Sequence, residues 1–328
     1  MKIKRNRIRV LLLGGLGNQL FGFFFAQALN QKLPGRVEVS DQLIPFGSNA
    51  SRSFVVDQLS ELKVQPIKSI RGLLGKSRWL SNLDFVRRIF WQLYRFNSFK
   101  RRMNLEDFWK VRKFPRYGIE ILDYFDNWFF PEYVAKNSGT SILGDFKSFY
   151  PRSPSNVETL EIVCHVRLGD YLKFPDTYKT LGENYYLSAI DLIRRENSAV
   201  KISVIVVSES SAEVREFYPK LASVSQRIVQ REDLSSDLDA FRVMMKAEFL
   251  IAANSTFSMW AAWLGLTRRS ITIVPLDSKQ KIASNGTMEL PWIVLDAQTG
   301  EILEKRPYSS WYQEHERKFN EVTSSIST

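Results

Sequence analysis

The stretch Gly14-Gly15-Leu16-Gly17-Asn18-Gln19-Leu20-Phe21 directly follows the apolar run from Ile8 to Leu13. The run predicts a buried strand, the glycines permit a tight turn with positive φ, and the apolar residues from Gln19 onward predict a buried helix. Asn18 is then expected at a strand-to-helix turn, where many α/β proteins bind ligands. A plain turn in which Asn18 caps the helix fits the spacing equally well, so both interpretations stay open.

Length and composition indicate a soluble protein of two domains. The chain has 328 residues, of which 44% are hydrophobic and 25% charged, as in ordinary globular proteins. Its one cysteine, Cys164, excludes an intrachain disulfide, and no Cys/His cluster has zinc spacing. The sequence contains no apolar run near the ~20 residues that cross a bilayer. We therefore expect a cytoplasmic protein in a reducing compartment.

The net charge of +11 is concentrated in the segment from Lys68 to Arg116, where basic residues are interleaved with aromatic ones. We expect this basic segment to form a helical insertion in the first lobe. Its pattern suits peripheral contact with an anionic membrane or a lipid-phosphate substrate, and resembles stretches that bind single-stranded nucleic acid. A solvated basic face over an aromatic core explains it equally well. Of the two binding partners, we expect the membrane and not nucleic acid.

A Pro/Ser-rich linker, Tyr150 to Asn156, predicts the domain boundary. The N-terminal lobe, residues 1–150, starts with a strand, a helix and a second strand at Arg36–Ser40. The C-terminal lobe, residues 157–328, alternates strands and helices, which predicts a parallel sheet covered on both faces. Its strands are expected at Glu161–Val166, Lys201–Val207, Arg227–Val229, Glu248–Ala252 and Ser270–Val274. Its helices are expected near Asn184–Arg195, Ser211–Phe217, Leu238–Lys246 and Thr256–Leu264, with Gly265 as a C-cap.

The second informative motif is Cys164-His165-Val166-Arg167-Leu168-Gly169-Asp170-Tyr171, at the C-terminal end of the first strand of this lobe. Ligands of open α/β sheets bind at that edge. Alternation places His165, Arg167 and Gly169 on one side, and the planar guanidinium suits a phosphate. Taken alone, the motif is better explained by an Arg167–Asp170 ion pair, with His165 buried in the core.

The third motif, Ala253-Asn254-Ser255-Thr256-Phe257-Ser258-Met259-Trp260, lies between a buried strand and an apolar helix. Asn254, Ser255 and Thr256 are of residue types that cap helices, and the free N–H groups of a helix start form an anion site. The motif could bind a diphosphate without metal. Ordinary capping explains it as well, so the motif gains weight only beside the other two.

Together these motifs resemble the α-1,2-fucosyltransferase family of bacterial type, whose members use GDP-fucose. The resemblance rests on GGLGNQLF, HVRLGDY and ANSTFSMWAAWLG, with Asp239-Ala240-Phe241 and Ser208-Glu209 also fitting, and it spans most of Gly14 to Gly265. It implies an α/β fold of GT-B type with two Rossmann-like lobes, the first on the acceptor side and the second binding the GDP-sugar. It also implies an inverting glycosyltransferase that needs no metal and no cofactor besides its donor substrate.

The resemblance assigns roles to individual residues. Arg167 and the turn Ser255-Thr256-Phe257 would hold the diphosphate, Asp239 would bind guanine, and Asn18 would approach the reacting centre. The implied donor-binding set is Gly17, His165, Arg167, Ser208, Asp239, Asn254, Ser255, Thr256 and Phe257. From its position beside the site, Asp170 is our first candidate for the general base, ahead of Asp176 and Glu183. Two positions depart from the family pattern: Leu168 replaces a second Arg and Met259 a Trp, and the first leaves the donor less certain.

The sequence thus predicts transfer of L-fucose from GDP-fucose to a hydroxyl, the 2-hydroxyl of a galactose-like residue. The expected acceptor is an oligosaccharide or lipid-linked surface-glycan precursor, as in O-antigen biosynthesis, at the inner membrane face. One alternative is a glycosyltransferase with another nucleotide sugar, or a metal-dependent one that uses Asp237-Leu238-Asp239. Another is an NAD-dependent oxidoreductase, because Gly15-Leu16-Gly17 and Glu38 partly fit the dinucleotide fingerprint.

Overall fold

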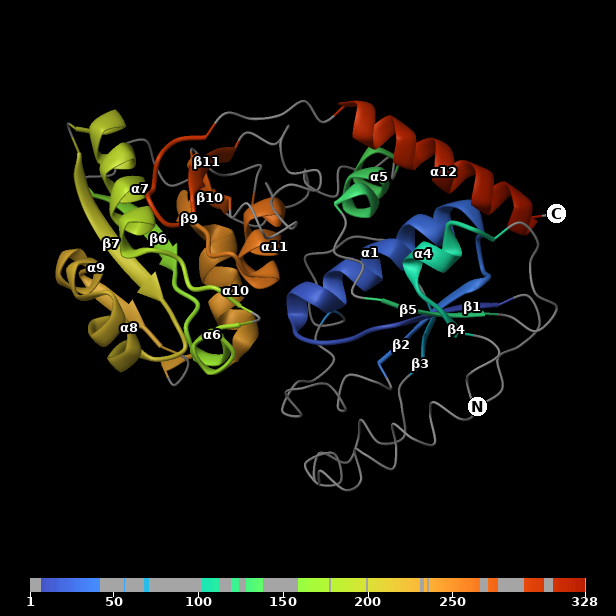
Figure 1. Cartoon of the computed structure of the whole chain (residues 1–328), viewed down its shortest axis with the longest axis horizontal. Coiled ribbons are helices and arrows are strands. Elements are labelled where there is room, and N and C mark those ends of the chain that lie inside the picture. The colour runs from blue at the N-terminus through green and yellow to red at the C-terminus, as the bar shows by residue number, and fades with distance from the viewer. Residues whose placement is uncertain are drawn as a thin grey trace, which may run out of the picture. The chain divides into compact units, whose positions relative to one another are not determined.

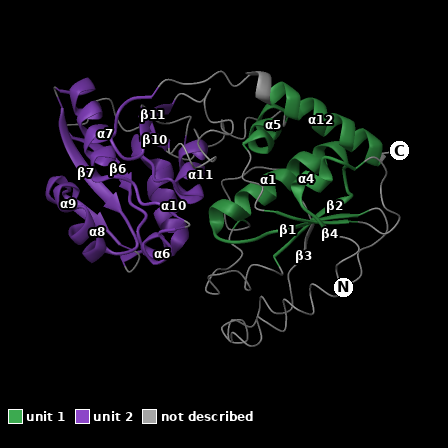
Figure 2. Cartoon of the chain, viewed as in Figure 1, with its two compact units in different colours: residues 1–142, 309–328 green, residues 143–308 purple. Residues whose placement is uncertain are grey.

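Two compact units make up the chain: residues 1–142 with 309–328, and residues 143–308 (Figure 2). The computed structural model describes residues 7–41, 56, 68–70, 102–111, 119–123, 128–137, 159–176, 178–198, 200–230, 233–234, 236–265, 271–276, 292–303 and 309–327. The predicted lobes, 1–150 and 157–328, differ from these units at the C-terminus. The last helix, α12 (Ser309–Ser327), belongs to unit 1 because its apolar face packs there.

Unit 1 contains a five-stranded sheet in the order β3-β2-β1-β5-β4, with all strand pairs parallel. Its strands are β1 (Ile8–Leu11), β2 (Val37–Ser40), β3 (Lys68–Ile70), β4 (Arg102–Met103) and β5 (Ile119–Leu122). Its other helices are α1 (Leu16–Lys32), α4 (Leu105–Phe108) and α5 (Phe129–Asn137). Figure 1 shows α1, α5 and α12 on the same side of this sheet.

Aromatic side chains hold α12 in unit 1. The ring of Phe319 lies 5.0 Å from that of Tyr133 and 6.3 Å from that of Trp109, and Phe319 is fully buried. Near the end of α12, the Ile326 carbonyl accepts a hydrogen bond of 3.1 Å from Arg36. Edge-to-face aromatic contacts of this kind stabilise a core beyond the area they bury. The C-terminal helix is therefore a structural part of unit 1.

A row of alternating charges crosses the centre of the unit 1 sheet. Register pairs Glu38 with Arg9 and Arg9 with Glu120, so the signs alternate over the three strands β2, β1 and β5. The three side chains are buried, and Arg9 lies 2.7 Å from Glu38 and 3.2 Å from Glu120. Since a slip of one residue would turn these charges to the opposite face, the row favours a single register.

Unit 2 is built on a six-stranded sheet in the order β11-β10-β9-β6-β7-β8, again with parallel pairs. Its strands are β6 (Thr159–His165), β7 (Lys201–Val207), β8 (Arg227–Val229), β9 (Phe249–Ile251), β10 (Ile271–Leu276) and β11 (Trp292–Asp296). Its helices are α6 (Gly169–Lys173), α7 (Glu183–Glu196), α8 (Ser211–Phe217), α9 (Pro219–Val224), α10 (Asp237–Lys246) and α11 (Thr256–Leu264). The strand order reverses between β6 and β9, the position where doubly wound sheets bind ligands.

Helices cover both faces of the unit 2 sheet, with α7, α8 and α9 on one side and α10 and α11 on the other (Figure 1). The two parallel sheets confirm the α/β, GT-B-type class expected from the sequence. In unit 2, the bounds of β7, β8, α8 and α11 are those predicted, and the other predicted elements agree within two residues. Gly265 caps α11, as expected.

Most of the basic segment, Lys68 to Arg116, lies outside the described residues, so the helical insertion stays a prediction there. At its described ends the helical prediction is wrong for Lys68–Ile70 and Arg102–Met103, which form the edge strands β3 and β4. Both ends extend the unit 1 sheet because they pair with neighbouring strands. No helix among the described residues combines the length and the apolar character needed to span a bilayer.

Candidate active site

The glycine motif of unit 1 forms the predicted turn between β1 and α1. Gly14 has φ +67°, and a Cβ there would lie 2.7 Å from the Asn18 side-chain nitrogen, so this position requires glycine. Gln19, which is buried, donates a hydrogen bond of 3.1 Å to the Gly14 carbonyl. The N-cap is Gly15, so the interpretation of Asn18 as the capping residue is wrong. Gly17 and Asn18 lie in the first turn of α1, and their contact with a donor stays a prediction.

In unit 2, the side chains of strand β6 and of the residues after it alternate between the two faces of the sheet, as predicted. Ile162, Cys164, Val166 and Leu168 all join one apolar core cluster with α7. Leu168, which stands where the family pattern has a second Arg, is fully buried and therefore serves packing. Burial also raises the pKa of the Cys164 thiol, so that this cysteine stays protonated.

His165, at the end of β6, is 5% exposed, and its ring lies 5.9 Å from that of Phe257. Its Nδ1 has no hydrogen-bond partner among the described residues. Burial, and to a smaller extent the charge of Arg167, lowers the pKa of His165 to about 3. The imidazole is therefore neutral near pH 7 and can accept a hydrogen bond from a ligand.

We expect the NMR signals of His165 to show no titration between pH 8 and pH 5. Because the pKa is lower in the folded protein than in the unfolded chain, His165 costs no stability above about pH 6.5. Folding stability then falls as the pH drops from about 6.5 toward 3. The only other histidine is His315, so the His315→Gln variant assigns the signals. A titration of His165 near pH 6.5 would contradict this burial.

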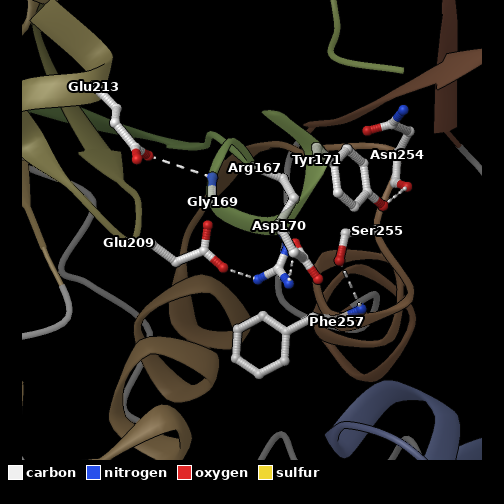
Figure 3. A network of polar contacts seen from close by, with 9 residues as sticks. All are labelled: Arg167, Gly169, Asp170, Tyr171, Glu209, Glu213, Asn254, Ser255 and Phe257. Carbon is white, nitrogen blue, oxygen red and sulfur yellow. Dashed lines mark hydrogen bonds and ion pairs between the residues drawn. The ribbon is translucent and has the colours of Figure 1, made fainter. Parts of the chain in front are cut away.

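Arg167 lies between two carboxylates (Figure 3). One terminal nitrogen is 2.7 Å from Asp170 Oδ1, and the other donates to Glu209 Oε1. The Arg167–Asp170 ion pair predicted as the simpler explanation is thus confirmed. The arrangement fixes the guanidinium but leaves the three groups with a net charge of about −1. An anionic ligand must therefore compete with Glu209 or Asp170 for Arg167.

Gly169 permits the close approach of Glu209. A Cβ at Gly169 would lie 2.5 Å from Glu209 Oε2, so any side chain there would displace the carboxylate. The Gly169 N–H also donates to Glu213 Oε2 at 3.3 Å (Figure 3). The HVRLGD motif and the start of α8 are thus packed together around Arg167.

The third motif surrounds the start of α11. Ser255 is the N-cap, and its hydroxyl accepts a hydrogen bond of 3.3 Å from the Phe257 N–H, which confirms the capping interpretation for this residue. Thr256 begins the helix, whose first turn contains no acidic residue. Asn254 does not cap the helix. Its Nδ2 donates a hydrogen bond of 2.7 Å to the Lys179 carbonyl, and its Oδ1 has no hydrogen-bond partner among the described residues.

The ends of three neighbouring strands thus present buried polar atoms without partners in the described part of unit 2. They are Nδ1 of His165 at the end of β6, Oγ of Ser208 after β7 and Oδ1 of Asn254 after β9. These three residues are only 5%, 7% and 8% exposed. Since each such atom costs about 1–3 kcal/mol when left unsatisfied, the three indicate a polar ligand at the strand order reversal.

The remaining predicted residues have other contacts. Asp239, in the first turn of α10, accepts a hydrogen bond of 3.0 Å from Ser236, and its role as a guanine contact stays a prediction. Glu183 accepts hydrogen bonds from the backbone of Lys220 and Leu221 at 2.7 and 3.0 Å. That carboxylate is used to cap α9, which argues against Glu183 as the base. Asp176 is exposed.

Sequence reasoning missed two residues of this network. Glu209 appeared only as part of the strand exit, and Tyr171 only as part of a motif. Tyr171 donates its hydroxyl to the Asn254 carbonyl at 2.9 Å, and burial raises its pKa to about 12, so it remains a donor. Glu209 follows β7, and Arg167 follows β6. Because adjacent parallel strands end side by side, the proximity of these two residues could have been predicted from the sequence.

Among the residues that the structure describes, no group of three His, Cys, Asp or Glu side chains is arranged to hold a metal ion. The pair Asp237 and Asp239, considered above as a metal site, lies in the first turn of α10, where acidic residues are favoured by the helix dipole.

Comparison with known proteins places the chain in a family. The Escherichia coli protein named alpha-1,2-colitosyltransferase is 31% identical over 121 residues, 36% of this chain and 40% of that relative. The E. coli O-antigen biosynthesis glycosyltransferase WbnK is 25% identical over 287 residues, 80% of this chain and 92% of that protein. The crystal structure of fucosyltransferase NodZ from Bradyrhizobium has a TM-score of 0.43 and 12% identity, covering 82% of this chain and 94% of NodZ. The family model for glycosyl transferase family 11 matches residues 7–295, which confirms the resemblance seen in the sequence, and the chain belongs to that family.

Proposed function

We propose that this glycosyltransferase transfers L-fucose from GDP-fucose to a hydroxyl of a glycan acceptor, with inversion and without a metal ion. The proposed acceptor hydroxyl is the 2-hydroxyl of a galactose-like residue. The relatives named for O-antigen biosynthesis and for alpha-1,2 transfer support a surface glycan and this linkage.

One observation carries the proposal: the three unpartnered polar atoms of His165, Ser208 and Asn254 lie at the strand order reversal of unit 2. A nucleoside diphosphate sugar has many donors and acceptors with which to satisfy them. The start of α11 supplies N–H donors for a diphosphate, and Arg167 supplies a cation once the ligand displaces one of its carboxylates. These features support a nucleotide sugar as the ligand.

The same groups can assist the proposed transfer reaction. In glycosyl transfer the sugar becomes oxocarbenium-like while negative charge grows on the leaving diphosphate. Donors held in place before the reaction, such as a fixed guanidinium and helix N–H groups, stabilise that charge. For the acceptor proton we propose Asp170 as the general base, with Asp176 as the second candidate. Asp170 can take this role once the diphosphate has drawn Arg167 away from it.

Replacing Glu209 with glutamine is expected to tighten GDP binding about tenfold, because the variant removes one negative charge that competes for Arg167. Calorimetric titration with GDP measures the effect. Glu216→Gln is the matched control. Glu216 is exposed on α8, the helix that follows Glu209, and its replacement should leave the dissociation constant for GDP unchanged. Weaker GDP binding in Glu209→Gln would mean that Glu209 orients the guanidinium and does not compete with the ligand.

Calorimetry with GDP-fucose in the presence of a chelator tests the proposed function itself. We expect GDP-fucose to bind without added metal and to bind more tightly than GDP-mannose. NADH should not bind. A second donor to test is GDP-colitose, suggested by the name of the relative alpha-1,2-colitosyltransferase. Since colitose is 3-deoxyfucose, comparing the two donors shows whether the 3-hydroxyl is recognised. Absence of any guanosine nucleotide binding would remove the proposal.

We also propose that the enzyme works in the cytoplasm, in peripheral contact with an anionic membrane through the basic segment. The charge of that segment supports this, since clustered Lys and Arg residues are attracted to anionic lipids. Reversing the charges of Lys100, Arg101 and Arg102 should reduce cosedimentation with vesicles of phosphatidylglycerol. Unchanged cosedimentation would count against the membrane contact.

A further inference from the structure

Two large aromatic side chains are exposed between α6 and α7. Phe174 is 57% exposed and Tyr178 is 39% exposed. The other large hydrophobic side chains exposed in the described residues, Phe217 and Ile302, lie singly on other elements. Exposed aromatic residues that are grouped on a surface mark interaction sites more often than single ones do.

The exposed ring of Tyr178 is connected to the candidate active site. It stacks on the ring of Tyr171, with centroids 4.8 Å apart and planes 10° apart. The ring of Tyr171 lies in turn 5.7 Å from the Arg167 guanidinium carbon. Tyr178 is therefore separated by one ring from the guanidinium that we propose holds the leaving diphosphate.

Asn254 holds both ends of this segment. Its carbonyl accepts the Tyr171 hydroxyl at 2.9 Å, and its Nδ2 donates to the Lys179 carbonyl at 2.7 Å (Figure 3 shows the first contact). Backbone hydrogen bonds add to this, from the Phe174 N–H to Asp170 at 3.1 Å and from the Tyr178 N–H to Phe174 at 2.9 Å. The backbone at both aromatic residues is thus held in place before any ligand binds, which lowers the entropic cost of binding.

We propose that Phe174 and Tyr178 form a stacking platform for a pyranose ring of the acceptor glycan. This inference rests on the proposed function. A pyranose has an apolar C–H face that packs on aromatic rings, while its hydroxyl edge needs polar neighbours. Lys173, Asp176 and Lys179 are exposed in the same segment and supply them. Binding sites for small polar ligands commonly combine aromatic surface with a few such groups.

The position of the platform selects the acceptor over the donor. The unpartnered atoms proposed for the nucleotide lie at the strand ends, and Arg167 is proposed to hold the diphosphate. A sugar bound on Tyr178 lies one ring beyond Arg167, outside the space proposed for the diphosphate, which leaves this position to the acceptor and not to the nucleotide. The exposure of both rings leaves one side open to a glycan that extends into solvent.

The test compares the Phe174→Ala and Tyr178→Ala variants with the unchanged protein. We expect the KM for a β-galactoside, with lactose as the probe, to rise about tenfold in each variant. GDP affinity and the slow hydrolysis of GDP-fucose by water should change less than twofold. Phe217→Ala, which removes an equally large exposed ring from α8, is the matched control. Tyr178→Phe keeps the ring and should keep the KM.

Saturation-transfer NMR of lactose binding, measured without donor, separates this inference from the proposed function. If GDP-fucose does not bind but lactose binding depends on Phe174 and Tyr178, the proposed donor fails and the platform stands. If GDP-fucose binds normally while KM and lactose binding are unaffected in both variants, the platform is overturned. Loss of a dimer in sedimentation, without a change in KM, would assign these rings to a second copy of the chain and overturn it too.

Discussion

The Arg167→Ala variant is expected to lose about 10²- to 10³-fold in turnover of GDP-fucose, as when a fixed donor to a developing negative charge is removed. Arg167 follows β6 and is paired with Asp170 and Glu209. Without it, the proposed leaving diphosphate loses a fixed cation that would balance its charge. The fold should survive, because the Asp170 and Glu209 side chains are 23% and 30% exposed and can be hydrated.

Kinetics with GDP-fucose and a galactoside, together with circular dichroism, check this result. Arg215→Ala is the matched control, since Arg215 lies exposed on α8 in the same unit and donates a hydrogen bond to Ser211 in its own helix. Equal kinetics for Arg167→Ala and Arg215→Ala would exclude a role for Arg167 in holding the diphosphate. A loss of GDP binding in Arg167→Ala, with its spectrum unchanged, would support that role.

The Arg9→Met variant is expected to lower the stability of unit 1 by about 3–5 kcal/mol, because it removes the cation that pairs with two buried carboxylates. Arg9 is 3% exposed, and the side chains of Glu38 and Glu120 are 7% and 9% exposed. Methionine has nearly the volume of the arginine stem, so lost packing contributes little. The loss should therefore come from charge and not from a cavity.

Guanidinium unfolding, followed by tryptophan fluorescence, measures this effect. The control is Arg317→Met on α12, whose ion pair with Glu321 is exposed and is worth about 0–1 kcal/mol. The triple variant Arg9→Met, Glu38→Gln, Glu120→Gln should regain part of the stability, since no buried charge is then unpaired. If Arg9→Met and Arg317→Met shift the unfolding midpoint equally, the charge row does not stabilise the sheet.

Prediction from sequence was most accurate where local pattern decides structure. The elements β7, α8, β8 and α11 were predicted with their observed bounds, because apolar periodicity, the N-cap Ser255 and the C-cap Gly265 are all local signals. Alternation along β6 also placed His165 and Arg167 on the side of the strand opposite the core cluster that contains Cys164 and Val166. The motifs that led to the family were read from short stretches in the same way.

Prediction failed where contacts join distant parts of the chain. The assignment of α12 to unit 1 depends on Phe319 meeting Tyr133 and Trp109, and nothing within the helix itself indicates those partners. The basic residues Lys68 and Arg102 suggested a helix, but both pair into the sheet as edge strands. Here long-range pairing overrode local pattern.

By itself, the sequence determined the α/β class, most elements of unit 2, and the residues His165, Arg167, Asn254 and Ser255 at the ends of strands. Only the tertiary structure decided what these side chains contact. Glu209 reaches Arg167 across 42 residues, and Asn254 holds Lys179 across 75. The physical reason is that strand and helix formation follow from neighbouring residues, whereas burial and ion pairing depend on which strands become neighbours in the sheet.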